Sequence, residues 1–302
     1  AEAVAAVTGA GLAAVPRGGG MSYTGGYVPA EHDAVVFDLA RMNRVLEING
    51  EDMYVRAECG CTWQALHAAL EGTGLRTPYW GTLSGIRATV GGGLSQNSIF
   101  WGSGRFGSAA DSVLGMEVVL ADGTILHTGA GAQRNAEPFF RHYGPDLTGL
   151  FTSDTGALGF KAVASLRLIP QMQDREYASF NFQDYPALVA AISEIARRGL
   201  AMELFAFDPY LQGQRLRRES LAKDLKALGG VMKSGRSVVG ALREGAKVAM
   251  AGRGYMDEVR WSLHVTVEER TAAGASAAMA AVQEICEARG GQSIANRIPK
   301  IM

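Results

Sequence analysis

Residues 16–27 read PRGGGMSYTGGY, with five glycines among residues 18–26. An apolar run precedes this stretch at residues 11–15, and an extended apolar run follows it at residues 34–38. Glycine loses more conformational freedom on folding than any other residue, so three in succession indicate a special backbone arrangement. Such a loop can point successive amides one way and form a nest for a phosphate or pyrophosphate. The alternative is a tight, flexible turn, which is the commoner meaning of a glycine cluster.

Length and composition bound the class of protein. The chain has 302 residues, which predicts about two domains. Its 47% of hydrophobic and 20% of charged residues are typical of a globular chain. A net charge of −1 gives no global field that would favour nucleic acid. We therefore expect no nucleic-acid partner. Neither a transmembrane run nor a signal-peptide pattern is found in the sequence.

The cysteines indicate a reducing compartment. Cys59, Cys61 and Cys286 are odd in number and too few for a disulfide scaffold. Reduced thiols in a cytoplasmic protein are the expectation. The two ends of the chain look cut, because residues 1–10 resemble the tail of a helix and residues 297–302 stop without a terminal element. We expect a segment to be missing at either end.

Several local signals predict elements in the first half. The Asn49-Gly50 turn joins strands at residues 44–48 and 53–58 into a hairpin, and Thr62 begins a helix. A second hairpin is expected at residues 113–128. Residues 77–107 are rich in glycine and hydroxyl residues and predict a long functional loop.

The pattern of predicted elements changes after Pro170. Strands and helices then alternate, with a helix that begins at Asp184 and buries Leu188, Ile192 and Ile195. A late helix is expected to bury Met279, Val282 and Ile285, and residues 208–250 read as largely helical. The division predicts domains at residues 1–170 and 171–302.

Three separated glycine segments resemble one family. The loop at residues 16–26, the block ATVGGG at 88–93 and the turn TGALG at 155–159 are similar to the flavin-contacting segments of FAD-linked oxidases of the vanillyl-alcohol oxidase/p-cresol methylhydroxylase (PCMH) type. The hairpin LGMEVVLADG at 114–123 and the segment MNRVLEI at 42–48 also resemble that family. Five pieces in the same order are far more specific than any one of them. No strand–GxGxxG–helix unit is present, so the glycines do not indicate a Rossmann fold.

The resemblance implies an α+β fold. A two-part PCMH-type FAD-binding domain would occupy residues 1–170, and an incomplete α+β cap, or substrate domain, would occupy residues 171–302. The cofactor would be FAD, with its pyrophosphate on the amides of the glycine-rich loop. The residues that the resemblance places at the cofactor are Arg17, Gly18, Gly19, Gly20, Met21, Ser22, Tyr23, Thr82, Ser84, Ala88, Thr89, Gly91, Gly92, Ser95, Asn97, Ser98, Gly156, Gly159 and Phe160.

Departures from the family pattern refine this expectation. Met21 stands where members with loop-attached flavin carry histidine, and residues 94–105 contain no cysteine. We therefore predict non-covalent FAD. Thr89 stands where phenol-oxidising members place an acidic residue, which argues against quinone-methide chemistry. In contrast, HYGPDLTGLF at residues 142–151 resembles that phenol-oxidising branch more than the lactate and glycolate branch. The hydroxy-acid branch would also show a histidine-rich metal cluster late in the chain; none is visible, but the chain stops before that region.

Oxidation of an alcohol needs a base for the hydroxyl proton. His264, in the strand WSLHV at residues 261–265, is the candidate base from the cap, and a core histidine with satisfied hydrogen bonds is the alternative. Weaker candidates are Tyr79, Arg105, His142 and Tyr143.

Residues 215–253 hold ten basic and three acidic side chains. A solvated helix face is the favoured interpretation, and a carboxylate-bearing substrate, an acidic electron-transfer partner or a membrane surface are the alternatives.

The sequence thus predicts an FAD-dependent oxidoreductase that oxidises a small hydroxylated substrate, either a 2-hydroxy acid or an aromatic alcohol or phenol. The alternative is a flavin-binding protein or fragment without turnover. Expected partners are the small-molecule substrate, an electron-acceptor protein or quinone, and further copies of the chain.

Overall fold

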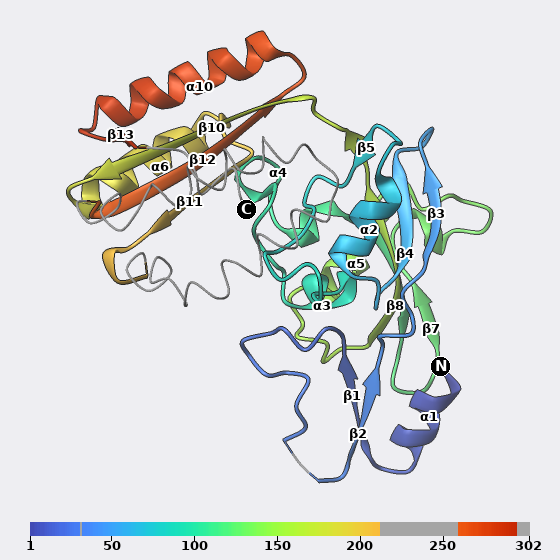
Figure 1. Cartoon of the computed structure of the whole chain (residues 1–302). Helices are drawn as coiled ribbons and strands as arrows, with labels where there is room; N and C mark the ends of the chain where they lie inside the picture. Colours follow the sequence, from blue (N-terminus) through green and yellow to red (C-terminus); the bar gives the residue numbers. More distant parts are fainter. Residues whose placement is uncertain (31, 212–258, 295–302) are drawn as a thin grey trace, which may run out of the picture. The chain divides into compact units, whose positions relative to one another are not determined.

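The computed structural model describes residues 1–302 except 31, 212–258 and 295–302 (Figure 1). The chain divides into two compact units. Unit 1 comprises residues 1–175, 201–203 and 267–275, and unit 2 comprises residues 176–200, 204–266 and 276–302. Residues 201–203 and 267–275 belong to unit 1, although they lie beyond residue 170, where the sequence places the domain boundary.

Unit 1 is built on a five-stranded antiparallel sheet in the order β3-β4-β8-β6-β7. Its strands are β3 (Val45–Asn49), β4 (Tyr54–Glu58), β6 (Val113–Val119), β7 (Ile125–His127) and β8 (Phe160–Arg167). Both predicted hairpins, β3/β4 and β6/β7, are confirmed. The first turn is held by Asn49, whose side-chain oxygen accepts the amides of Glu51 and Asp52 at 3.0 and 2.8 Å.

Helices of unit 1 cover one face of this sheet (Figure 1). Helix α2 (Trp63–Leu70) begins at Thr62, whose hydroxyl accepts the amide of Ala65 at 3.1 Å, as the sequence predicts. Helix α3 (Val90–Ser95) and the short helices α4 (Ser103–Phe106) and α5 (Leu147–Leu150) follow.

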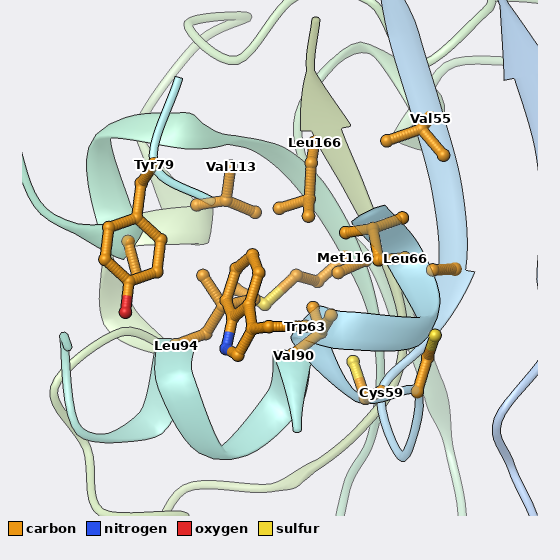
Figure 2. Packing of buried hydrophobic residues seen from close by; sticks show 14 of the residues in the cluster. Val55, Cys59, Trp63, Leu66, Tyr79, Val90, Leu94, Val113, Met116 and Leu166 are labelled. Carbon is orange, nitrogen blue, oxygen red and sulfur yellow. The ribbon is translucent and has the colours of Figure 1, made fainter. Parts of the chain in front are cut away.

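The main core lies between α2, α3 and the sheet (Figure 2). Trp63 and Leu66 of α2 and Leu94 of α3 meet Met116 of β6 and Leu166 of β8, and all five side chains are buried. Fully burying a large apolar side chain stabilises the fold by roughly 1.5–3 kcal/mol, so this cluster fixes α3 on the sheet.

Helix α3 corrects the expectation of a loop over residues 77–107. Its sequence, VGGGLS, has poor helix propensity because each glycine costs backbone entropy. Thr89 caps the helix by accepting the amide of Gly92 at 3.2 Å. A Cβ at Gly91 would lie 2.7 Å from Cys59 Cβ, so close packing requires glycine there.

Two smaller sheets complete unit 1. The parallel pair β1 (Ala13–Arg17) and β2 (Ala34–Asp38) brackets the glycine-rich loop. Helix α1 (Glu2–Gly9) contributes Val4 to a small core with Val119 and Phe160. Strands β5 (Leu75–Arg76) and β9 (Ile169–Pro170) form an antiparallel pair.

Unit 2 holds a four-stranded sheet in the order β11-β12-β10-β13. The strands are β10 (Asp174–Phe182), β11 (Glu203–Phe207), β12 (Trp261–Glu269) and β13 (Gln292–Ile294), of which β10, β11 and β12 run into unit 1. Helix α6 (Tyr185–Arg197) begins at Asp184 as predicted, but it buries Leu188, Ala191 and Ile195, while Ile192 is only half-buried.

Helix α10 (Ala272–Glu287) runs alongside β10 and β12 (Figure 1). The three side chains predicted to face inward, Met279, Val282 and Ile285, are buried. The helical prediction for residues 208–250 and the basic segment at 215–253 lie almost entirely outside the described residues.

Candidate FAD site

The glycine-rich loop begins at the end of β1 (Ala13–Arg17). Within the described residues, no protein group accepts a hydrogen bond from the amides of residues 18–23. Gly20 has a φ of +65°, in the left-handed region that glycine adopts without strain. Successive free amides at a glycine turn are the donors that an anionic phosphate requires.

The first two glycines of the loop are fixed by a second segment. A Cβ at Gly18 would lie 2.4 Å from Thr89 Oγ1, and a Cβ at Gly19 would lie 1.9 Å from the carbonyl oxygen of Arg87. Both distances are far below van der Waals contact. Glycine is therefore required here because residues 87–89 approach the loop directly.

The second segment carries short polar side chains around α3. The hydroxyls of Thr82 and Ser84 lie 2.9 Å apart. Asn97 has a φ of +45°, and its side-chain oxygen accepts the amide of Ala110 at 3.2 Å. Gln96 Oε1 accepts the hydroxyl of Thr24 at 3.4 Å, which links the end of α3 to the glycine-rich loop.

A third segment, the turn at residues 153–156, meets both of the others. The amides of Ser153 and Thr155 donate to the carbonyl oxygens of Leu94 and Ser95 at 3.1 and 2.9 Å. A Cβ at Gly156 would lie 3.0 Å from the ring of Pro16. The three predicted glycine segments therefore lie together in the folded unit, although 128 residues separate the loop at 16–26 from the turn at 155–159.

Two predicted site residues, Gly159 and Phe160, pack against other parts of unit 1. Phe160 is buried in the small core, with its ring 5.1 Å from that of Phe37. A Cβ at Gly159 would lie 2.5 Å from Val118 Cγ1, so this glycine serves packing on β6. A role for either residue at a cofactor would have to come from its backbone.

Met21 and Tyr23 are exposed beyond the free amides, at 42% and about 107% of their reference areas. Arg17 stacks on Tyr27, with its guanidinium carbon 6.0 Å from the ring centroid. Free amides, glycines pressed against neighbouring backbone and a rim of exposed side chains fit the diphosphate of a dinucleotide. The chemistry of the loop thus suits FAD, and the individual cofactor contacts stay predictions.

His264 has the contacts of a core histidine. It is buried, its Nδ1 lies 2.9 Å from Ser179 Oγ, and its Nε2 lies 3.0 Å from Ser262 Oγ. Burial lowers the pKa of its imidazole to about 4, so the ring is neutral at pH 7. Both nitrogens are engaged, which favours the structural alternative; the catalytic role stays a prediction.

The weaker candidates are scattered. Tyr79 is buried, and its ring packs edge-on against Trp63 at 4.9 Å. Burial raises the pKa of its phenol, and the nearby Ser98 hydroxyl opposes that shift. His142 and Tyr143 are exposed on the segment before α5.

An arginine cluster around the buried carboxylate of Glu268 lies in unit 1 and was not indicated by the sequence. Arg76 is buried; it donates to the carbonyl oxygens of Thr77 and Pro78 at 2.9 and 3.0 Å and to the carboxylate of Glu268. Arg175 Nε donates to the other oxygen of Glu268 at 2.9 Å. Burial lowers the pKa of Arg76, and Glu268 opposes that shift. No local signal could have paired residues that lie 192 positions apart.

Arg105, the remaining weak candidate, belongs to the same cluster. Its Nη1 donates to the carbonyl oxygen of Glu268 at 3.0 Å and to the carboxylate of Glu269 at 2.8 Å. These contacts give Arg105 a structural role in unit 1.

The described residues contain neither a metal-binding cluster nor a helix suited to span a membrane. No group of three or more His, Cys, Asp or Glu side chains that could hold a metal ion is found among them. No helix in that part of the chain is both long and apolar enough to cross a membrane. The three cysteines are free and buried, and burial raises the pKa of the Cys59 and Cys286 thiols to about 12.

Solved structures share this fold. Alkyldihydroxyacetonephosphate synthase aligns over 97% of this chain and 49% of its own, with 19% identity and a TM-score of 0.71. p-Cresol methylhydroxylase aligns over 96% of this chain and 55% of its own, with 18% identity and a TM-score of 0.68. These likenesses concern the fold.

Sequence relatives point the same way. "Probable D-lactate dehydrogenase, mitochondrial" of Danio rerio is 34% identical over 65% of this chain and 38% of its own length. The glycolate oxidase subunit GlcD of Bacillus subtilis is 31% identical over 60% of this chain and 37% of its own. The chain thus spans about two fifths of the length of these relatives. A family model described as "FAD binding domain" matches residues 1–129. Residues 1–129 of the chain thus match an FAD binding domain, and the chain shares the fold of p-cresol methylhydroxylase.

Proposed function

We propose that the protein binds FAD non-covalently on the three glycine segments and oxidises a small 2-hydroxy acid. The observation that carries the proposal is the meeting of residues 16–20, 87–97 and 153–156, with the amides of residues 18–23 unused by the described protein. Bound FAD would accept two electrons from a carbon–hydrogen bond of the substrate. The role of the chain's own residues would be to bind the dinucleotide and to hold it in one position.

Each segment has a distinct part in that task. The amides after β1 would stabilise the negative charge of the diphosphate by donating hydrogen bonds to its oxygens. Residues 87–89 set the depth of the loop because Gly18 and Gly19 press on them. The hydroxyls of Thr82 and Ser84 would offer short donors and acceptors to the rest of the cofactor.

The substrate class is supported by the names of the sequence relatives. They include D-lactate dehydrogenase, glycolate oxidase and D-2-hydroxyglutarate dehydrogenase, all named for 2-hydroxy acids. An aromatic alcohol or phenol is the second candidate. It is supported by the resemblance of residues 142–151 to the phenol-oxidising branch and by the shared fold with p-cresol methylhydroxylase and 4-ethylphenol oxidase.

Titration with FAD, followed by anaerobic addition of substrate, tests the proposal. The purified chain should quench FAD fluorescence with a saturable Kd. Its flavin absorbance should then bleach with lactate, glycolate or 2-hydroxyglutarate. Bleaching by vanillyl alcohol or cresol alone would select the second candidate. Binding without bleaching by any of the five would leave a flavin-binding protein without turnover, and a protein that takes up no FAD would exclude all three.

A further inference from the structure

The turn that joins the glycine-rich loop to α3 is held in an unfavourable conformation. Ser153, Thr155 and Gly156 have φ angles of 57°, 54° and 86°. Glycine adopts this left-handed region freely, but a β-branched threonine there is an outlier. Such a conformation persists only where the surrounding structure determines it from several sides.

A buried ion pair lies inside this turn. Asp154 and Lys161 have side chains that are 2% and 3% exposed, and Lys161 Nζ lies 2.7 Å from Asp154 Oδ1. Oδ1 also accepts the amide of Gly156 at 3.0 Å, and Oδ2 accepts the amide of Leu158 at 3.4 Å. The carboxylate therefore binds the turn from within, and Lys161 ties it to β8.

The same turn contacts both other parts of the FAD site. It donates two backbone hydrogen bonds to the carbonyl oxygens of Leu94 and Ser95, at the end of α3. On its other side, Gly156 lies against Pro16, and a Cβ at Gly26 would lie 3.5 Å from Thr155 O. A shift of the turn would therefore move the glycine-rich loop relative to α3.

We propose that Asp154 and Lys161 are positioning residues for the FAD site, an inference that rests on the proposed function. A buried ion pair stabilises a fold little more than an apolar pair of the same volume. The Asp154 carboxylate, however, orients the backbone of the turn, because it accepts the amides of Gly156 and Leu158. The pair thus selects the one turn conformation that holds residues 16–26 against α3.

The test neutralises the pair without leaving a lone buried charge. Asp154→Asn with Lys161→Met keeps the size of both side chains. The matched control is Arg56→Met with Glu117→Gln, which neutralises an ion pair of 2.7 Å between β4 and β6 in the same unit. Thermal unfolding of the FAD-free proteins and their Kd for FAD are then measured.

The proposal expects a split between stability and affinity. The Asp154/Lys161 double variant should unfold within a few degrees of the control, yet bind FAD at least tenfold more weakly. Adding Thr155→Gly should recover part of that affinity, because glycine adopts the left-handed turn without help. A Kd within twofold of the control, or a loss of affinity matched by an equal loss of stability, would overturn the proposal.

A ligand-free measurement separates this proposal from the proposed function. Amide hydrogen exchange of residues 90–97 and 153–156 should accelerate in the double variant and not in the control, because the amides of Ser153 and Thr155 donate to the end of α3. If the wild-type chain binds no FAD, the proposed function fails, and unchanged exchange would overturn the positioning role on its own. Should the double variant not fold, Asp154→Asn with Lys161→Gln carries the same measurements, since it leaves no lone buried charge and asparagine keeps an acceptor for the Gly156 amide.

Discussion

Gly93 of α3 packs against the edge of the indole of Trp63 in α2, where a Cβ would come within 2.9 Å of both Nε1 and Cζ2. This contact explains how a segment of three glycines becomes a helix. The entropy that glycine loses in a helix is offset by the close approach of α3 to a large buried ring. The position of α3 beside the candidate site therefore depends on the packing of Gly93 against Trp63.

Gly93→Ala should therefore destabilise unit 1. Adding a methyl group to a filled core costs roughly 1–3 kcal/mol, because neighbouring side chains must leave their rotamers. Urea unfolding followed by tryptophan fluorescence measures the loss. Gly9→Ala, at a position with open space for a Cβ, is the control and should not destabilise. Equal midpoints for both variants would contradict the packing argument.

Gly19→Ala should weaken FAD binding by at least about tenfold, which corresponds to ~1.4 kcal/mol. A Cβ there would collide with the backbone oxygen of Arg87, which cannot rotate away. Gly26→Ala, in the same loop, meets only ordinary contacts at 3.5 Å and should bind like the wild type. Fluorescence titration with FAD distinguishes the two, and the prediction fails if both variants keep wild-type affinity.

Acid precipitation of the FAD-loaded protein should release the flavin into the supernatant. Met21 lacks the imidazole through which histidine attaches flavin in some relatives, and residues 94–105 contain no cysteine. Absorbance of the supernatant and of the redissolved pellet measures the two fractions. Flavin that stays with the pellet would show a covalent bond formed by another residue.

Lowering the pH should remove the stability that comes from neutral, buried His264. Its folded-state pKa of about 4 lies below the usual ~6.5, so the unfolded chain binds more protons between these values. The contribution is present above pH 6.5 and is lost as the pH falls towards 4, by about 3 kcal/mol at most.

Unfolding curves at pH 7, 5.5 and 4 compare the wild type with His264→Gln. The difference in the free energy of unfolding should shrink as the pH falls. His127→Gln, at an exposed position of β7, is the control and should follow the wild type. A constant difference between wild type and His264→Gln would show that the imidazole is not buried in its neutral form.

Glu268→Gln should destabilise the protein by roughly 3–5 kcal/mol, because it leaves the buried guanidinium of Arg76 without its counter-charge. Glu269→Gln removes the neighbouring carboxylate, whose pair with Arg105 is about a third exposed, and should cost no more than ~1 kcal/mol. Thermal unfolding of the two variants measures the contrast. A similar shift for both would mean that Arg76 finds another partner.

Elements with local signals could be predicted from the sequence. Thr62 and Asp184 cap helices through side chains three residues from the amides they accept, and Asn49 closes its hairpin within three residues. These hydrogen bonds form between near neighbours, so the pattern of residue types is sufficient. The joining of the three glycine segments was implied by resemblance, since no spacing rule brings Pro16 to Gly156.

The features that the sequence did not predict are α3, the surroundings of Arg76 and the turn around Asp154. Each depends on contacts that the local sequence does not specify. The propensity of α3 argues against a helix, and its close packing on Trp63 and Cys59 helps to reverse that preference. Arg76 reads as an ordinary surface arginine until Glu268 is folded beside it. Asp154 and Lys161 are only seven residues apart, yet nothing in their spacing reveals the left-handed turn that they enclose.

The contacts of Gly18 and Gly19 with residues 87–89 bear on how this protein can be engineered. The glycine-rich loop is one half of a fitted pair, so a loop from another flavoprotein transplanted alone would meet a surface shaped for different atoms. Chimeras should exchange residues 16–26 and 87–97 together. Libraries that vary Thr89 should hold Gly18 constant, because the residue at position 89 fills the space that a side chain at position 18 would need.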